Sequence, residues 1–434
     1  MIALDAPSDF PSRLPRSALD SDATAAIAHL QRNGFMAYFV GGCVRDLLLG
    51  RRPKDFDIVT SATPTEIKRL FRNCRLIGRR FRLAHLYYGS KIIEAATFRG
   101  ASAADGRTRI EDQGSVERTN TFGTPEEDAF SRDFTVNALL YDPVKRSVID
   151  FVGGTRDLVA GCLRTIGDPM RRFEEDPVRI LRAVKFASRL GFRVAPEVQV
   201  AMRVHAHLIA TCPPPRVTEE VFRIAESRHF ELAVEVMTGA GVLGSILPEV
   251  ATRLDDSASR ARFGRLARAV DRTGRAYESV PRELILPALL YPLLIDGTSG
   301  ALRPAPGLGE QALTIAHPLL DRMQIPARLR ESLRATMNVL GAIRGAVAPP
   351  QGRRARSVLA SPSFDTALGM LRLIHQTEGG AWPSYSNWAW AREGRATIAP
   401  AVRATNEEPP SGGPQTQRQK RRRRRSTSRA TLPT

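Results

Sequence analysis

The sequence contains little cysteine, and its cysteines indicate neither disulfides nor a metal site. The four residues are far apart and show neither the paired spacing of a disulfide-rich domain nor the short spacing of zinc ligands. They are Cys43, Cys74, Cys162 and Cys212. We therefore expect four small buried side chains in a protein of a reducing cytoplasm.

Long apolar runs are also missing. The longest, residues 284–295, is interrupted by Pro287 and Pro292 and is too short for a bilayer, which needs about 20 helical residues. It fits a buried helix or helix pair. Residues 1–15 carry acidic residues and prolines in place of the apolar centre of a signal peptide. We expect no membrane segment and no secretion signal, and the sequence has no internal repeat.

Positive charge, in contrast, is abundant. The 434 residues include 64 Lys and Arg against 45 Asp and Glu, so the net charge is +19. Residues 418–429 hold eight of these positive charges, and subtracting them leaves +11 on the rest of the chain. An excess of this size is typical of proteins with an anionic partner, and we expect nucleic acid.

The order of predicted elements favours an α+β unit followed by a helical one. In the first part we expect helices at 21–33, 44–49, 64–73 and 131–139. Strands are expected at 36–40, 55–59, 81–88, 91–97 and 148–151, with a long polar loop at 100–127. Beyond Asp168-Pro169, which should cap a helix, helical periodicity runs through 176–190 to about residue 374. From residue 398 apolar residues are sparse, which predicts a disordered basic tail.

Asp55 and Asp57 are the strongest candidates for chemistry. On a strand, side chains at i and i+2 share a face, so the two carboxylates can bind a divalent metal such as Mg²⁺. Gly41 and Gly42 just upstream permit a turn that approaches phosphate. Arg45 and Arg132 can pair with phosphate. Metal beside phosphate is the pattern of nucleotidyl transfer.

A third carboxylate often completes such a site, and two residues qualify. Glu94 lies on the second arm of the predicted hairpin, and Asp133 follows Arg132 at a predicted helix start. Asp133 is preferred, because a neighbouring arginine and the helix dipole both favour its ionised form. The choice between the two stays open at this point.

Two further motifs carry polar groups suited to nucleotides and RNA. Asp176 and Arg179, at i and i+3 of a predicted helix, can pair with each other and can offer both a donor and an acceptor to a base edge. Arg79, Arg80 and Arg82 in GRRFRLAH (78–85) surround an aromatic residue, as in phosphate and base contacts. His85 has no visible metal partner and is interpreted as structural.

These motifs together resemble a known family. VGGCVRD (40–46), DFDI (55–58), RDFTVNA (132–138) and EDPVRILR (175–182) resemble the class II nucleotidyltransferases of the DNA polymerase β superfamily, which include CCA-adding enzymes and bacterial poly(A) polymerases. The resemblance implies a polymerase β-like head with a small mixed sheet, followed by helical neck, body and tail. It implies catalytic Asp55 and Asp57, triphosphate contacts from Arg132 and Arg182, and base selection by Asp176 and Arg179. Ser131 stands where many relatives have a second arginine.

Divided in this way, the chain has five predicted parts. They are a flexible leader (1–20), a head (21–152), a neck that selects the base and binds RNA (153–225), a helical RNA-binding body (226–397) and a basic tail (398–434). GRRFRLAH resembles the poly(A) polymerase branch, whereas CCA-adding enzymes usually carry Arg-Phe-Gly-Thr there. The basic C-terminus favours the same branch.

The predicted function is therefore template-independent addition of AMP from ATP to RNA 3′ ends, with two Mg²⁺ ions held by Asp55 and Asp57 and with help from Asp133. RNA-decay machinery is a further predicted partner. Two alternatives stay open, namely CCA addition to tRNA and RNA binding without catalysis. The intact aspartate pair in a basic protein counts against the second.

Overall fold

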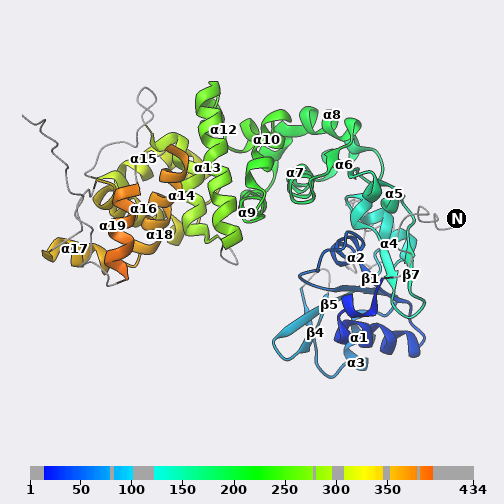
Figure 1. Ribbon diagram of the computed structural model, residues 1–434. Helices are drawn as coiled ribbons and strands as arrows, with labels where there is room; N and C mark the ends of the chain where they lie inside the picture. Colours follow the sequence, from blue (N-terminus) through cyan, green and yellow to red (C-terminus); the bar gives the residue numbers. More distant parts are fainter. Residues whose placement is uncertain are drawn as a thin grey trace, which may run out of the picture.

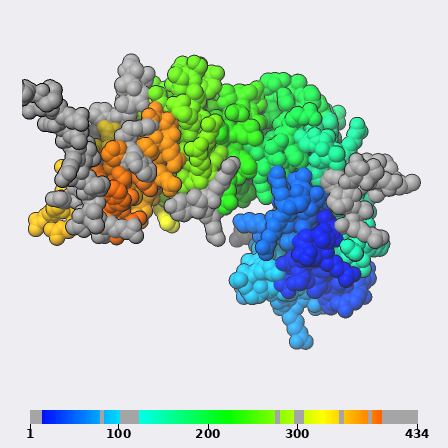
Figure 2. Space-filling view, in the orientation of Figure 1, coloured from blue at the N-terminus to red at the C-terminus, as the bar shows by residue number. Residues whose placement is uncertain are grey.

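The structure, a computed structural model, describes residues 14–78, 83–100, 122–276, 280–295, 307–345, 352–378 and 382–393. A mixed sheet with its helices forms one end of the molecule, and the remaining helices form a row that leads away from it (Figure 1). The space-filling view shows the resulting elongated, bent outline (Figure 2). The predicted α+β class is confirmed.

Seven strands make up the sheet, in the order β3-β4-β5-β2-β1-β6-β7. They are β1 (Ala37–Val40), β2 (Asp57–Thr60), β3 (Cys74–Ile77), β4 (Leu83–Tyr88), β5 (Lys91–Thr97), β6 (Leu140–Asp142) and β7 (Ser147–Ile149). All neighbours are antiparallel except β2 and β5, which run parallel and place Asp57 opposite Glu94. The site residues of two distant segments therefore meet at the centre of the sheet.

Local signals account for the first helices. Asp20 accepts a hydrogen bond from Ala23 N and begins α1 (Ser21–Arg32), and Thr63 forms a capping box with Glu66 at the start of α3 (Pro64–Leu70). The short helix α2 (Gly42–Leu48) follows the Gly-Gly turn as predicted. Within the predicted leader, the described residues include a short 3₁₀ helix (Arg16–Ala18), and Leu14 packs into the core.

Several predicted boundaries are wrong. The predicted loop 100–127 ends early, because Thr124 and Glu127 form a second capping box that begins α4 (Pro125–Ser131). Residues 101–121 lie outside the described residues. The strand predicted from residue 55 begins at Asp57, and strands β3 and β6 were not predicted. Short strands of three or four residues leave too weak an alternation to be recognised.

The helix predicted at 131–139 is replaced by an extended segment and one 3₁₀ turn (Thr135–Asn137). The cause is tertiary pairing with residues 164–166. Thr135 N donates to Arg164 O, Ile166 N donates to Asp133 O, and Phe134 bridges Thr165. These bonds hold Asp133 and its neighbours in an extended conformation that no local pattern predicts.

The chain then continues through a short helix, α5 (Gly154–Val159), and a small parallel pair, β8 (Cys162–Leu163) and β9 (Arg193–Val194). Two helices that matter for the site follow, α6 (Pro169–Glu175), which Asp168 caps as predicted, and α7 (Val178–Leu190). The single helix predicted from residue 176 begins at Val178, because Asp176 and Pro177 form the break between the two. Ile180, Leu181 and Val184 form the buried face of α7, and Gly191 ends it at φ +72°.

The rest of the described chain is helical, as predicted. These helices are α8 (Pro196–His205), α9 (Pro214–Ala225), α10 (Phe230–Gly239), α11 (Val242–Ile246), α12 (Pro248–Arg253), α13 (Ser257–Ala276), α14 (Arg282–Leu294), α15 (Leu308–Arg322), α16 (Ala327–Ile343), α17 (Gly352–Leu359), α18 (Phe364–Glu378) and α19 (Trp382–Arg392). The apolar run predicted to be a buried helix is α14, which contains Pro287 and Pro292 and is buried from Leu284 to Leu294. Among the described helices, none combines the length and apolar character that crossing a membrane requires.

Candidate active site

Asp57 begins β2 at the centre of the sheet, half-buried and surrounded by negative charge. Its partner in the parallel register is Glu94 on β5, and Asp55 precedes it by two residues in an exposed position. Burial, Glu94 and Asp55, in that order, raise the pKa of the Asp57 carboxyl to about 6, and only the positive charge of Arg132 opposes them. The structure therefore brings Asp55, Asp57 and Glu94 together around the start of β2, in the middle of the sheet.

This crowding fits a divalent cation. Carboxylate oxygens are the ligands that Mg²⁺ prefers, and a bound cation would offset the mutual repulsion that raises the Asp57 pKa. In the described part of the chain, no three His, Cys, Asp or Glu side chains are arranged closely enough to form a complete metal site. The donor set is thus partial, as expected where phosphate oxygens and water supply the remaining ligands.

His85 is also part of this cluster. It lies opposite Glu94 across β4 and β5, and its Nε2 is 3.6 Å from Glu94 Oε1. The sequence predicted only a structural role for this histidine, because strand register, which brings it to Glu94, is not visible from spacing. The same GRRFRLAH motif contains Arg79, Arg80 and Arg82, which lie outside the described residues, so their predicted RNA contacts stay predictions.

The Gly-Gly turn approaches Arg132. Gly41 has φ +75° and ψ −127°, a conformation that a residue with a Cβ adopts only under strain. A Cβ built on Gly41 would lie 3.3 Å from Arg132 Nη1 and 3.6 Å from Asn137 O, and one on Gly42 would lie 3.6 Å from Arg45 Nη2. The turn therefore leaves just enough room for a guanidinium beside its backbone.

Arg45 has partners other than the predicted phosphate. It is 1% exposed, and its guanidinium donates to Asp46 Oδ1 at 2.7 and 2.8 Å and to Asn137 Oδ1 at 2.5 Å. Asp46 in turn binds Arg189 of α7 at 3.1 Å. In the structure Arg45 supports the turn from within, and Asp46 links the turn to the helices beyond the sheet.

Arg132 is held beside the acidic cluster. Its Nε and Nη2 donate to Asp128 Oδ2 at 2.9 and 2.8 Å, and Asp128 is buried in α4. Ser131, at the position of the departure from the family pattern, donates its hydroxyl to Asp128 O. Arg99, just after β5, is a cation that sequence reasoning missed, and its backbone N donates to Asp128 Oδ1. Burial, followed by the positive charge of Arg132, lowers the pKa of Arg99.

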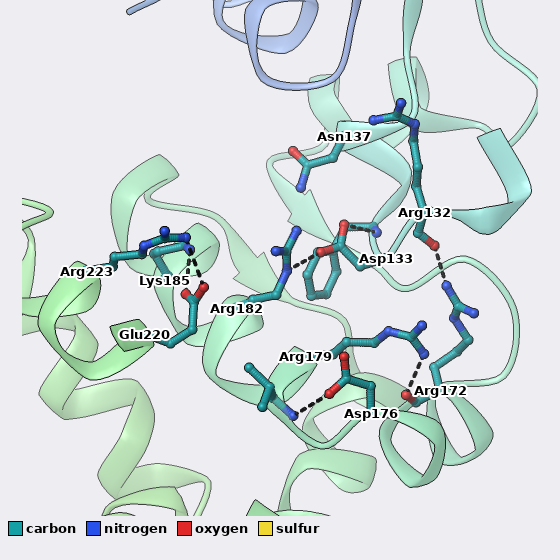
Figure 3. Close-up of polar contacts among 12 residues, drawn as sticks. Arg132, Asp133, Asn137, Arg172, Asp176, Arg179, Arg182, Lys185, Glu220 and Arg223 are labelled. Carbon is teal, nitrogen blue, oxygen red and sulfur yellow. Dashed lines mark hydrogen bonds and ion pairs between the residues drawn. The ribbon is translucent and has the colours of Figure 1, made fainter. Parts of the chain in front are cut away.

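Asp133 points to the helices and pairs with Arg182. Its Oδ2 accepts from Arg182 Nε at 2.6 Å, and its Oδ1 accepts from Phe134 N at 2.9 Å (Figure 3). Burial disfavours the charge on Arg182, yet Asp133 raises its pKa overall. Of the two candidates for a third carboxylate, Glu94 is the one opposite Asp57, whereas both oxygens of Asp133 already have donors.

The predicted base-reading residues lie close together but do not form the predicted pair. Asp176, in the break between α6 and α7, accepts from Arg216 Nη2 of α9 at 2.9 Å. Arg179, in the first turn of α7, donates to Glu175 Oε2 and to the carbonyl of Arg172, each at 2.8 Å. Figure 3 shows both beside Arg182 and Asp133. Because Asp176 is not helical, it and Arg179 do not lie on one helix face, which the i and i+3 spacing had predicted.

Comparison with known proteins agrees with this arrangement. Residues 37–164 match the Poly A polymerase head domain family, and residues 191–254 match the family described as the probable RNA and SrmB-binding site of polymerase A. Poly(A) polymerase I of Salmonella typhi is 36% identical over 377 residues, which cover 84% of this chain and 80% of that protein. The chain belongs to the poly(A) polymerase I family. Membership in this family of nucleotidyltransferases confirms the resemblance drawn from the four motifs.

CCA-adding enzymes are also similar to the chain. The CCA-adding enzyme of Bacillus pumilus is 35% identical over 228 residues, or 52% of this chain and 55% of that protein. Among solved structures, the CCA-adding enzyme of Bacillus stearothermophilus in complex with CTP is similar, with a TM-score of 0.64, 26% identity and coverage of 85% of this chain and 81% of that one. This chain and the CCA-adding enzyme of Bacillus stearothermophilus therefore share a fold.

Proposed function

We propose that the protein adds AMP from ATP to RNA 3′ ends without a template and releases pyrophosphate. The observation that carries this proposal is the acidic cluster of Asp55, Asp57 and Glu94, which lies beside Arg132, a cation that in turn has Arg99 nearby. Acidic groups that attract a divalent cation, next to guanidinium groups that pair with phosphate, suit the transfer of a nucleotidyl group.

In the proposed reaction the 3′ hydroxyl of RNA attacks the α-phosphorus of ATP, and the bond from that phosphorus to the pyrophosphate oxygen breaks. Asp55, Asp57 and Glu94 would hold two Mg²⁺ ions, which supply acidification of the attacking hydroxyl and neutralisation of the developing charge. Arg132 and Arg182 bind the triphosphate, and the Gly41-Gly42 turn lets it approach the backbone. Asp133 orients Arg182 through their 2.6 Å contact.

Base selection falls to Asp176 and Arg179, which lie near Arg182 in Figure 3. The helical part, with the residues that match the RNA-binding family, retains RNA together with the basic tail. Because these contacts are to phosphate, they do not depend on sequence. The cytoplasm as the place of action and the RNA-decay machinery as a partner stay predictions from the sequence.

Primer extension tests the proposal directly. Wild-type protein is supplied with each nucleoside triphosphate in turn, on an oligo(A) primer and on tRNA that lacks its CCA end. We expect long A tails on both RNAs with ATP alone. We expect Asp57→Asn to abolish extension while Asp255→Asn, which removes an exposed acid of the helical part, does not.

Addition that stops after CCA and occurs on tRNA alone would assign the protein to the CCA-adding enzymes instead. RNA binding with no extension under any condition would support the non-catalytic alternative.

A further inference from the structure

Arg172 of α6 links the segment that carries Arg132 to the helix that carries Arg179. The residue is 8% exposed, and its Nη2 donates to the carbonyl oxygens of Arg132 at 2.5 Å and of Ser131 at 3.3 Å. Its own carbonyl accepts from Arg179 Nη1 at 2.8 Å. Figure 3 shows the contacts of Arg172 with Arg132 and with Arg179 as one connected path.

Glu175 strengthens this path. One oxygen, Oε2, accepts from Arg172 Nη1 at 3.2 Å and from Arg179 Nη1 at 2.8 Å. A single carboxylate between two guanidinium groups offsets their repulsion and fixes their separation. Arg132 is anchored a second time, because its side chain is bound by Asp128. Both ends of the path are therefore restrained.

Stability alone does not explain this arrangement. The guanidinium of Arg172 is buried, and its Nε has no hydrogen-bond partner among the described residues. Burial, followed by the charge of Arg179, lowers the pKa of Arg172. A buried donor without a partner costs free energy, and a buried charge is often no more stabilising than an apolar side chain. An arrangement that is costly, yet joins Arg132 to Arg179 through hydrogen bonds, suggests a positional role.

We infer that Arg172, together with Glu175, is a positioning residue for nucleotide selection, which holds the phosphate-binding Arg132 and the base-reading Arg179 at the separation that a bound ATP spans. The inference rests on the proposed function, since it assumes that both arginines contact the nucleotide. Selection between a purine and a pyrimidine depends on where Arg179 lies relative to the triphosphate. A misplacement of about 1 Å can change a rate by about 100-fold.

The test compares Arg172→Met and Glu175→Gln with the matched control Arg171→Met, which replaces an exposed arginine one position away on the same helix. For each variant, kcat and KM are measured separately for ATP and for CTP on an oligo(A) primer, together with the thermal unfolding midpoint. We expect the ratio of kcat/KM for ATP to that for CTP to fall about 10-fold or more in Arg172→Met and less in Glu175→Gln. Arg171→Met should keep the wild-type ratio.

Further variants separate positioning from simple support of the fold. Arg172→Lys retains the charge but lacks the separate planar nitrogens that reach the two carbonyls and Glu175, so its ratio should lie between those of wild type and Arg172→Met. In the double variant Arg172→Met with Glu175→Gln, the ATP-to-CTP ratio should fall by less than the two single effects combined, because the two residues act as a unit.

An unchanged ATP-to-CTP ratio in folded Arg172→Met, with both rates reduced alike, would overturn the inference. If Arg172→Met does not fold, an unchanged ratio in Glu175→Gln overturns it equally. Either result leaves the proposed function intact, whereas failure of the wild-type protein to incorporate AMP would refute the proposed function itself.

Discussion

Asp57 lies opposite Glu94 in the parallel register of β2 and β5, and this pairing places two carboxylates side by side at the centre of the sheet. Together with burial and Asp55, it raises the Asp57 pKa to about 6. A folded protein that holds such a group ionised has a reduced stability, which a bound cation or a neutral side chain would restore.

Asp57→Asn is therefore expected to stabilise the metal-free protein at alkaline pH. The pKa of Asp57 in the folded protein lies above its ordinary value of 3.8, so the penalty is absent below about pH 4, grows as pH rises towards 6 and is complete above it. The variant should gain about 1–3 kcal/mol in free energy of unfolding at pH 8 and nothing at pH 4. Urea unfolding in EDTA at both pH values measures this, with Asp255→Asn as control. Equal stability of variant and wild type at pH 8 would contradict the pKa argument.

Glu94 and Asp133 should differ in how they affect the metal requirement. Glu94→Gln is expected to raise the Mg²⁺ concentration for half-maximal AMP addition and to lower kcat by about 100-fold, since it would remove a proposed metal ligand. Asp133→Asn releases Arg182 and should chiefly raise KM for ATP. Titrations of Mg²⁺ and of ATP for each variant distinguish the two roles. A larger shift of the Mg²⁺ titration in Asp133→Asn would make Asp133 the third carboxylate.

Gly41→Ala should impair ATP binding as well as stability. The substitution places a Cβ 3.3 Å from Arg132 Nη1 at φ +75°, so both the turn and the guanidinium must shift. Gly34→Ala is the matched control, because Gly34 has φ +85° with no atom within 4 Å of a Cβ. Both variants should lose about 1–3 kcal/mol of stability from backbone strain, but only Gly41→Ala should raise KM for ATP. A similar KM in both variants would remove Arg132 from the triphosphate site.

The basic C-terminal segment should dominate the salt dependence of RNA affinity. For single-stranded nucleic acid, each phosphate that the protein neutralises adds about 0.7 to the magnitude of the slope of log K against log salt. Replacing the eight basic residues of 418–429 by Gln should therefore lower the magnitude of this slope by up to about 6. Fluorescence anisotropy with a labelled oligo(A) across salt concentrations measures this. Extension rates at saturating RNA should be unchanged, and a slope that stays at the wild-type value would exclude the segment from RNA contact.

The sequence predicted well where a motif is local. The capping box at Thr63, the Gly-Gly turn and the helix begun by Asp168 each depend on residues within a few positions of one another, and each is present. Prediction was wrong where hydrogen bonds between distant segments determine the local conformation. The segment at 131–139 is extended because residues 164–166 pair with it, and His85 meets Glu94 only through strand register.

The same limit applies to the site. Helical spacing predicted a contact between Asp176 and Arg179, but each has another partner, Arg216 and Glu175, from outside the pair. The break before α7, which causes this, coincides with Pro177, because proline disfavours a helical conformation in the residue before it, here Asp176. Arg99 and Arg172 could not be recognised, since a lone arginine in a basic chain carries no signal.

The burial of the cysteines has a practical consequence for spectroscopy. Cys43 packs behind Asp57 with 2% exposure and a pKa that burial raises to about 12, and Cys74, Cys162 and Cys212 are buried as well. Thiol reagents therefore have no accessible native target in the folded protein. A fluorophore pair attached to two introduced surface cysteines, one on the sheet-containing end and one on the helical row, would report the distance between them during a catalytic cycle without replacement of any native cysteine.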